Sequence, residues 1–86
     1  MYKLIFSPQA LDSYNYFVKK EVVIVRKINN LIKDIMESPF SGIGKPEPLK
    51  YELSGCWSRR ISQQHRLVYK VVDDELHIIS CQFHYQ

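Results

Sequence analysis

The sequence predicts an α+β domain of β-α-α-β-β-β order, in which a helical hairpin covers one face of an antiparallel sheet. Two stretches between residues 8 and 37 repeat their apolar side chains at helical spacing. Three later stretches are rich in β-branched and aromatic residues, and turn-forming residues separate them. A chain of 86 residues, 45% of them hydrophobic, has room for one core, so we expect a single domain spanning residues 1–86.

The first expected element is a short β-prone run at residues 2–7, which is ended by Ser7 and Pro8. Serine is a good N-cap and proline suits the first helical position, so a helix should begin here. Two groups of apolar residues then recur at helical spacing: Leu11, Tyr14, Phe17 and Val18, followed by Ile24, Ile28, Leu31, Ile32 and Ile35. A surface helix must bury such a stripe, so both helices should pack on the sheet.

The boundary between the two helices is weakly marked. The chain near Lys20-Glu21 has neither glycine nor proline, and residues 22–25 (VVIV) favour a strand locally. One bent helix is therefore the alternative to a hairpin. The second helix should stop near Ser38-Pro39.

Three strands and two turns should follow: strands at residues 56–62, 66–72 and 76–85, with turns at 63–65 and 73–75. A three-residue second turn places apolar side chains of the last two strands on one face: Leu67, Tyr69 and Val71 with Ile79, Cys81 and Phe83. A two-residue turn would bring Ser80 and Gln82 to that face, so we favour the longer turn. The opposite face then carries polar side chains: Ser58, Arg60, Ser62, Arg66, Ser80, Gln82 and His84.

The net charge of +3 is concentrated in one segment, residues 45–66. It contains five basic and two acidic side chains: Lys45, Lys50, Arg59, Arg60 and Arg66, against Glu47 and Glu52. The rest of the chain has seven of each sign and balances. Such a segment favours a polyanionic partner, usually RNA or DNA. The alternative is a solvated loop whose lysines serve solubility.

Other features of the sequence indicate where in the cell the protein is found. No apolar run approaches the roughly 18 to 20 residues of a membrane span, and residues 1–5 are too short and too soon polar for a signal peptide. We therefore expect a cytoplasmic protein without a membrane partner.

Cys56 and Cys81 lie in strand-like sequence and are expected to be buried, reduced thiols. Cys81 and His84, three apart on a strand, point to opposite faces, which argues against a shared metal ion.

The triplet Pro46-Glu47-Pro48 stiffens a carboxylate from both sides, since proline fixes its own φ and restricts the residue before it. With Arg66 and His84 on the polar sheet face, Glu47 completes a set of groups that cleaves RNA without a metal or other cofactor. Glu47 would take the proton of the 2′-hydroxyl, Arg66 would stabilise the charge at phosphorus, and His84 would protonate the leaving 5′-oxygen. The expected products are a 2′,3′-cyclic phosphate and a 5′-hydroxyl.

Three more side chains are candidates for substrate binding. Lys50 and Arg60 are expected to help hold the phosphate, and Tyr85 to stack on a base or share in proton handling. The alternatives are structural. Glu47 would then pair with a neighbouring lysine, the arginines would be ordinary surface charges, and His84 would be exposed and uninvolved.

Several motifs together resemble the YoeB/Txe family of bacterial toxins, relatives of the RelE-type messenger RNA interferases. They are the GKPEPLK loop (residues 44–50), SRRI-x3-HRLVY (58–69) and the terminal HY (84–85), with SPQALDSYNYF (7–17) and KINNLIKDI (27–35) in the first half. The resemblance covers nearly all of the chain. It implies a RelE-like fold and a catalytic set that falls on Glu47, Arg66 and His84. It also places substrate-binding residues at Lys50, Arg60 and Tyr85. Two positions depart from the family pattern, because Gln86 follows the usual terminal tyrosine and Cys56 replaces an aromatic residue.

The resemblance also implies a biology: a toxin of a type II toxin-antitoxin system that enters the ribosomal A site, contacts ribosomal RNA and cuts messenger RNA. A YefM-like antitoxin would wrap the toxin, and with it the protein would repress its own operon, touching operator DNA only through the antitoxin. Homodimers are known in the family. Two other functions remain as alternatives, a ParE-like inhibitor of DNA gyrase and a non-catalytic module that binds antitoxin and DNA.

Overall fold

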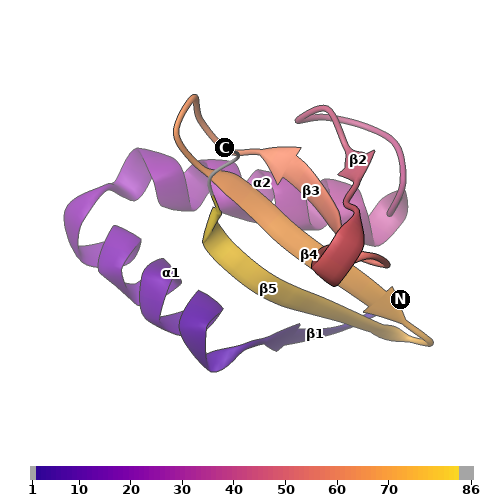
Figure 1. Ribbon diagram of the computed structural model, residues 1–86. Coiled ribbons are helices and arrows are strands. Elements are labelled where there is room, and N and C mark those ends of the chain that lie inside the picture. The colour runs from indigo at the N-terminus through magenta and orange to yellow at the C-terminus, as the bar shows by residue number, and fades with distance from the viewer. Residues whose placement is uncertain (1, 84–86) are drawn as a thin grey trace.

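The computed structural model describes residues 2–83 of the chain. The elements are β1 (Lys3–Phe6), α1 (Pro8–Lys20), α2 (Val22–Glu37), β2 (Glu47–Pro48), the 3₁₀ helix η1 (Tyr51–Leu53), β3 (Trp57–Arg60), β4 (Arg66–Val72) and β5 (Glu75–Phe83). Within these residues the strands form one five-stranded sheet in the order β1-β5-β4-β3-β2. Both helices lie on one face of the sheet and η1 lies on the other (Figure 1). The predicted α+β class is therefore confirmed.

The helical hairpin begins and breaks where the sequence indicated. Ser7 Oγ accepts a hydrogen bond from the Ala10 amide at 3.0 Å and donates one to the Ile79 carbonyl at 2.8 Å, which ties the start of α1 to β5. Glu21 leaves helical conformation, with φ −145° and ψ 77°, so α1 and α2 are separate helices. The second helix ends at Glu37, next to the predicted stop.

The sheet differs from the prediction in two ways. It is mixed rather than antiparallel, because β1 pairs with β5 in parallel. Between β1 and β5 the chain passes through both helices and three further strands, and such a long connection permits parallel pairing. The second difference is β2, whose two residues, Glu47 and Pro48, pair with Ser58 and Trp57 of β3. A two-residue strand is too short to leave a periodic signal, and its proline is tolerated because β2 is an edge strand.

The predicted three-residue turn between β4 and β5 is wrong. Val72 pairs with Glu75, which leaves a two-residue turn. Its first residue, Asp73, has φ 54°, a left-handed conformation that aspartate tolerates better than most residues.

A β-bulge reconciles this shorter turn with an apolar core. Tyr69 pairs with Ile78 but Val68 pairs with Ser80, so Ile79 is an extra residue in β5. Alternation along β5 reverses at the bulge, and Ile78 before it and Cys81 after it both join the core beneath the helices. The predicted core positions Leu67, Tyr69, Val71 and Cys81 are confirmed, whereas Ile79 packs on the other face of the sheet.

One further side chain departs from the predicted polar face. A second shift in register separates the pairs Val68 with Ser80 and Arg66 with Phe83. Gln82 turns toward α1 and accepts a hydrogen bond from Ser13 Oγ at 2.9 Å. Its predicted place opposite the helices is therefore wrong.

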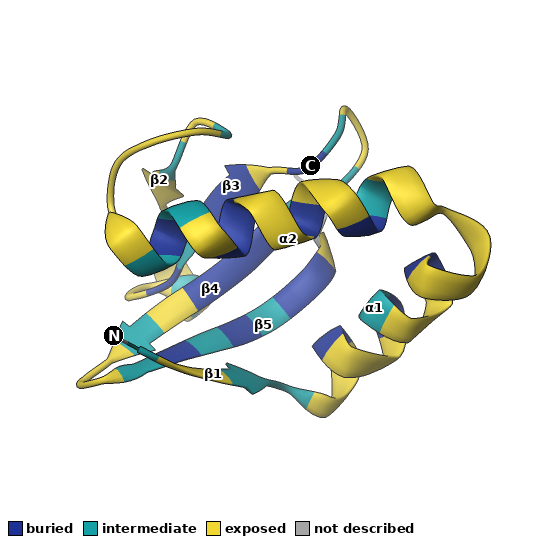
Figure 2. Cartoon of the chain, turned by 180° about the vertical axis from the view of Figure 1, so that it is seen from behind, coloured by how far each residue is buried: buried dark blue, intermediate teal, exposed yellow. Residues whose placement is uncertain are grey.

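Two apolar clusters hold these layers together. The main core lies between the helices and the sheet, where the inward faces of α1, α2, β4 and β5 are buried (Figure 2). A smaller cluster on the opposite face is formed by Leu49, Cys56 and Val68, with Leu53 and Ile79 packed against them. It fixes residues 49–56 to the sheet, next to the segment that carries Glu47. Between residues 2 and 83, neither helix combines the length and the apolar character of a membrane span.

Candidate active site

Glu47 and Arg66 meet on the sheet face that the helices leave uncovered. Arg66 Nη1 lies 3.3 Å from Glu47 Oε1 and 3.4 Å from Ser58 Oγ. The Glu47 side chain is 49% exposed and that of Arg66 is 16% exposed, so the pair is held by the protein yet open to a ligand. Two of the three predicted catalytic residues are therefore neighbours, although nineteen positions of sequence separate them.

The polypeptide around Glu47 is restrained from several directions. Prolines flank it, and its strand β2 pairs with Ser58 of β3. The Leu49 amide donates to the Cys56 carbonyl at 2.9 Å, and both side chains belong to the smaller apolar cluster. The stiffness expected from the prolines is thus reinforced by strand pairing and by burial of Leu49.

Two further cations lie on the segments that carry the pair. Arg60 is opposite Arg66 in the β3–β4 ladder, and directly opposed residues of antiparallel strands project to the same face. Its amide donates to the Gly44 carbonyl at 2.6 Å, which joins β3 to the loop before β2. Lys50 follows the buried Leu49 and is exposed. Two guanidinium groups and an ammonium group thus belong to the Glu47 segment and its partner strands, as an anionic substrate requires.

The other two predicted site residues, His84 and Tyr85, lie outside the described residues, as does Gln86. The last described residue of β5, Phe83, pairs with Arg66.

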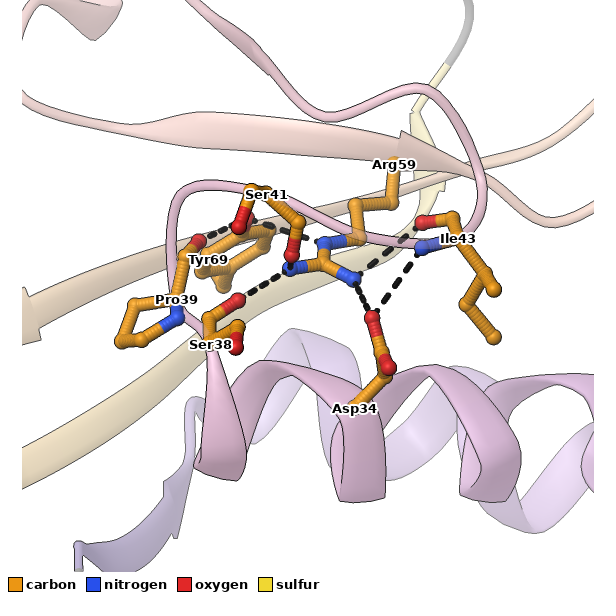
Figure 3. Close-up of polar contacts among 7 residues, drawn as sticks. All are labelled: Asp34, Ser38, Pro39, Ser41, Ile43, Arg59 and Tyr69. Atoms are coloured by element: carbon orange, nitrogen blue, oxygen red, sulfur yellow. Dashed lines mark hydrogen bonds and ion pairs between the residues drawn. The ribbon is translucent and has the colours of Figure 1, made fainter.

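Arg59 has a role that sequence reasoning missed. It was counted with the basic segment, but its side chain is fully buried and points to the helix side of β3 (Figure 3). Its Nε donates to Tyr69 Oη at 3.2 Å, and Nη1 donates to Asp34 Oδ2 and to the Ile43 carbonyl. Nη2 donates to the carbonyls of Ser38 and Ser41, at 2.6 and 2.8 Å.

This arrangement fixes the loop that leads from α2 to β2. The Ile43 amide donates back to Asp34 Oδ2 at 3.0 Å, and Tyr69 Oη donates to the Pro39 carbonyl at 2.6 Å. The hydrogen bond from Arg59, followed by that from the Ile43 amide, lowers the pKa of Asp34. Burial raises the pKa of Tyr69, against the opposing effect of Arg59. Asp34 thus compensates the charge of Arg59, which is buried and is not available to bind an external anion.

The remaining sequence features are structural. Both cysteines are buried free thiols, as expected, and burial raises the pKa of Cys81 to about 12. Trp57 packs against the main core, with its ring 4.9 Å from that of Phe40. The His65 ring meets Phe17 edge to face at 5.4 Å, which joins the β3–β4 turn to α1.

Known proteins that resemble this chain in sequence and in structure are bacterial toxins. A family model described as the YoeB-like toxin of bacterial type II toxin-antitoxin systems matches residues 6–85. The toxin YoeB of Escherichia coli K12 is 57% identical over 83 residues, which is 96% of this chain and 99% of that protein. A YoeB dimer from Staphylococcus aureus aligns with a TM-score of 0.93 at 48% identity, covering 98% of each chain. A heterotetrameric YoeB-YefM toxin-antitoxin complex from the same organism gives 0.90 at 48% identity over 99% of each chain.

Proposed function

Because the chain belongs to the family of YoeB-like toxins of bacterial type II toxin-antitoxin systems, we propose that it is a metal-independent endoribonuclease. It enters the ribosomal A site, contacts ribosomal RNA there and cuts the messenger, which stops translation in the cytoplasm. The observation that carries this proposal is the accessible pair of Glu47 and Arg66, 3.3 Å apart, with Arg60 opposite Arg66 in the sheet. A base and a stabilising cation at one place are what attack by a 2′-hydroxyl requires.

The reaction follows from the chemistry of three side chains. Glu47 accepts the proton of the 2′-hydroxyl, and the oxygen attacks the neighbouring phosphorus. Arg66 stabilises the negative charge that grows on the phosphoryl oxygens. The bond from phosphorus to the 5′-oxygen breaks, and His84 gives that oxygen a proton. The products are a 2′,3′-cyclic phosphate and a 5′-hydroxyl, so atoms and charges balance without water.

The remaining residues hold the substrate. Lys50 and Arg60 bind phosphate oxygens, since both are cations on the Glu47 segment or its partner strand. Tyr85 stacks on a base next to the cleavage site. The prolines beside Glu47 and the buried Leu49 keep the base in position, because misplacement of a catalytic group reduces the rate strongly.

The proposed partners follow from the relatives. The YoeB-YefM complex supports an antitoxin of the YefM kind as the inhibitor of this chain, and the YoeB dimer supports a homodimer. With its antitoxin bound, the protein would repress its own operon and reach operator DNA only through the antitoxin. The helix-free face that carries Glu47 and Arg66 is the surface an inhibitor must cover or distort.

Brief expression in bacteria tests the proposal. Primer extension maps messenger 5′ ends while growth is scored, for the wild type, His84→Ala, Glu47→Gln and Glu52→Gln. The last is a matched control, because Glu52 is an exposed carboxylate in the same loop. We expect growth arrest and new cuts inside codons for the wild type and the control, and cutting reduced about 10²- to 10⁴-fold in the other two. Arrest with intact messengers, or equal cutting by His84→Ala, would contradict the mechanism.

A further inference from the structure

Tyr51 is an exposed aromatic residue in a strained backbone conformation. Its side chain is 84% exposed, more than any other large hydrophobic residue on the described surface. Its φ is 58°, in the left-handed region that favours glycine and asparagine. A bulky side chain in this region is unusual, and such outliers concentrate at functional sites. Folding alone explains neither the exposure nor the choice of tyrosine, since glycine would fit this backbone without strain.

The loop around Tyr51 is rigid. The Leu53 amide donates to the Lys50 carbonyl at 3.1 Å, and the Ser54 amide donates to the Tyr51 carbonyl at 3.0 Å. The Cys56 amide closes the turn on the Leu53 carbonyl at 2.9 Å. Leu53 and Cys56 also pack in the smaller apolar cluster. The ring of Tyr51 is therefore presented to solvent from a fixed support.

The surroundings of this ring favour an anionic ligand. Lys50 precedes it in the chain and is exposed. On the other side of the loop, Lys70 Nζ lies 3.9 Å from where a Cβ on Gly55 would be, so this ammonium group borders the turn. Glu52 is the acidic side chain of η1. The turn lies on the face of the sheet away from the helices, the same face as Glu47 and Arg66 (Figure 1).

We propose that Tyr51, with Lys50 before it in the chain and Lys70 next to Gly55 at the end of the same turn, is a second RNA contact, whose ring stacks on an unpaired base while the two lysines meet the backbone phosphates. An exposed aromatic ring together with nearby cations is the usual support for single-stranded nucleic acid, because every base offers a face for stacking. The contact rests on the proposed function and extends it beyond the nucleotides that are cut. It lies four residues after Glu47, on the same restrained segment.

Binding to a fluorescein-labelled, single-stranded RNA that is 2′-O-methylated throughout tests this contact by anisotropy. The 2′-O-methyl groups block attack by the 2′-oxygen, so binding is measured without cleavage. Tyr51→Gly removes the ring and suits the backbone, and Tyr51→Phe keeps the ring. Tyr16→Ala is the matched control, because Tyr16 is an exposed tyrosine of α1 on the opposite layer.

We expect Tyr51→Gly to bind about 5- to 150-fold more weakly, the range that corresponds to loss of one stacked base. Its melting temperature should equal or exceed that of the wild type, while Tyr51→Phe and Tyr16→Ala should bind normally. Equal binding by wild type and Tyr51→Gly, or no binding by either, would overturn the proposal. Weakened binding to a YefM-like antitoxin with unchanged RNA binding would also overturn it, in favour of a protein contact.

Failure of this contact is distinguishable from failure of the proposed nuclease function. A wild type that binds the methylated RNA through Tyr51 but cuts no messenger on ribosomes would contradict the nuclease function and leave the stacking contact in place. If wild type and Tyr51→Gly cut messengers equally and also bind the methylated RNA equally, the stacking contact is contradicted and the nuclease function stands.

Discussion

Replacing Arg59 with methionine is expected to destabilise the protein by about 3 to 5 kcal/mol, the usual effect of removing one partner from a buried charged network. Arg59 is fully buried and donates five hydrogen bonds, three of them to backbone carbonyls of the loop after α2. Each hydrogen bond to a charged group contributes roughly 1.5 to 3 kcal/mol. The expected loss is smaller than the sum of these five contributions, because the loop is partly exposed and its carbonyls form hydrogen bonds with water once the loop moves.

Urea denaturation followed by circular dichroism measures this effect. Arg60→Met is the matched control, because Arg60 is the next residue of β3 and its side chain is exposed. The control should change stability by no more than about 0.5 kcal/mol. For a domain of this size, the loss in Arg59→Met corresponds to a melting temperature lower by at least about 12 °C. Equal stability of the two variants would refute the assignment of Arg59 as the residue that fixes the loop.

Three further predictions follow from the same region and from the core. Because the folded pKa of Asp34 lies below its ordinary value of 3.8, its contribution to stability is present above that pH and lost as pH falls through the folded pKa. In Asp34→Asn, the free energy of unfolding should therefore depend less steeply on pH as the pH falls from 3.8 through the folded pKa of Asp34. Gly42→Ala should lower the urea midpoint, since its Cβ would lie 2.0 Å from Asp34 Oδ2 at a φ of 127°. Iodoacetamide at pH 8 should leave Cys81 unmodified in the native protein and label it in urea, as mass spectrometry of the peptides will show.

Local signals in the sequence predict the helices and the approximate strand positions. Ser7 and Pro8 are a cap and a first helical residue wherever they occur, so the start of α1 needs no tertiary information. The register of β5 is different. Alternation predicts it only for an unbroken strand, and the bulge at Ile79 breaks the alternation between Ile78 and Cys81. A two-residue turn with a bulge buries Leu76, Ile78 and Cys81 of β5, whereas a longer turn without one would bury Ile79, Cys81 and Phe83, and both sets are apolar.

In the candidate site, too, local signals in the sequence identify some residues and miss others. Glu47 and Arg66 are identifiable from charge, flanking prolines and family motifs, although their 3.3 Å approach depends on the pairing of β2 with β3. Arg59 shows the limit of such reasoning. Its partner Asp34 lies 25 residues earlier, on a helix, and no local pattern in the sequence identifies this partner. Alternation along β3 was the available signal, because it puts adjacent arginines on opposite faces.

The most direct test of the proposed reaction is the cleavage of two messengers on programmed ribosomes by the purified protein. One messenger is all ribonucleotide, and the other has a single 2′-deoxynucleotide at the position that is cut. We predict that the first is cut to a 2′,3′-cyclic phosphate and a 5′-hydroxyl and that the second stays intact, because the attacking oxygen is missing. Cleavage of the deoxy-substituted messenger at the same place, or a 5′-phosphate product, would contradict attack by the 2′-hydroxyl and the role of Glu47 as its base.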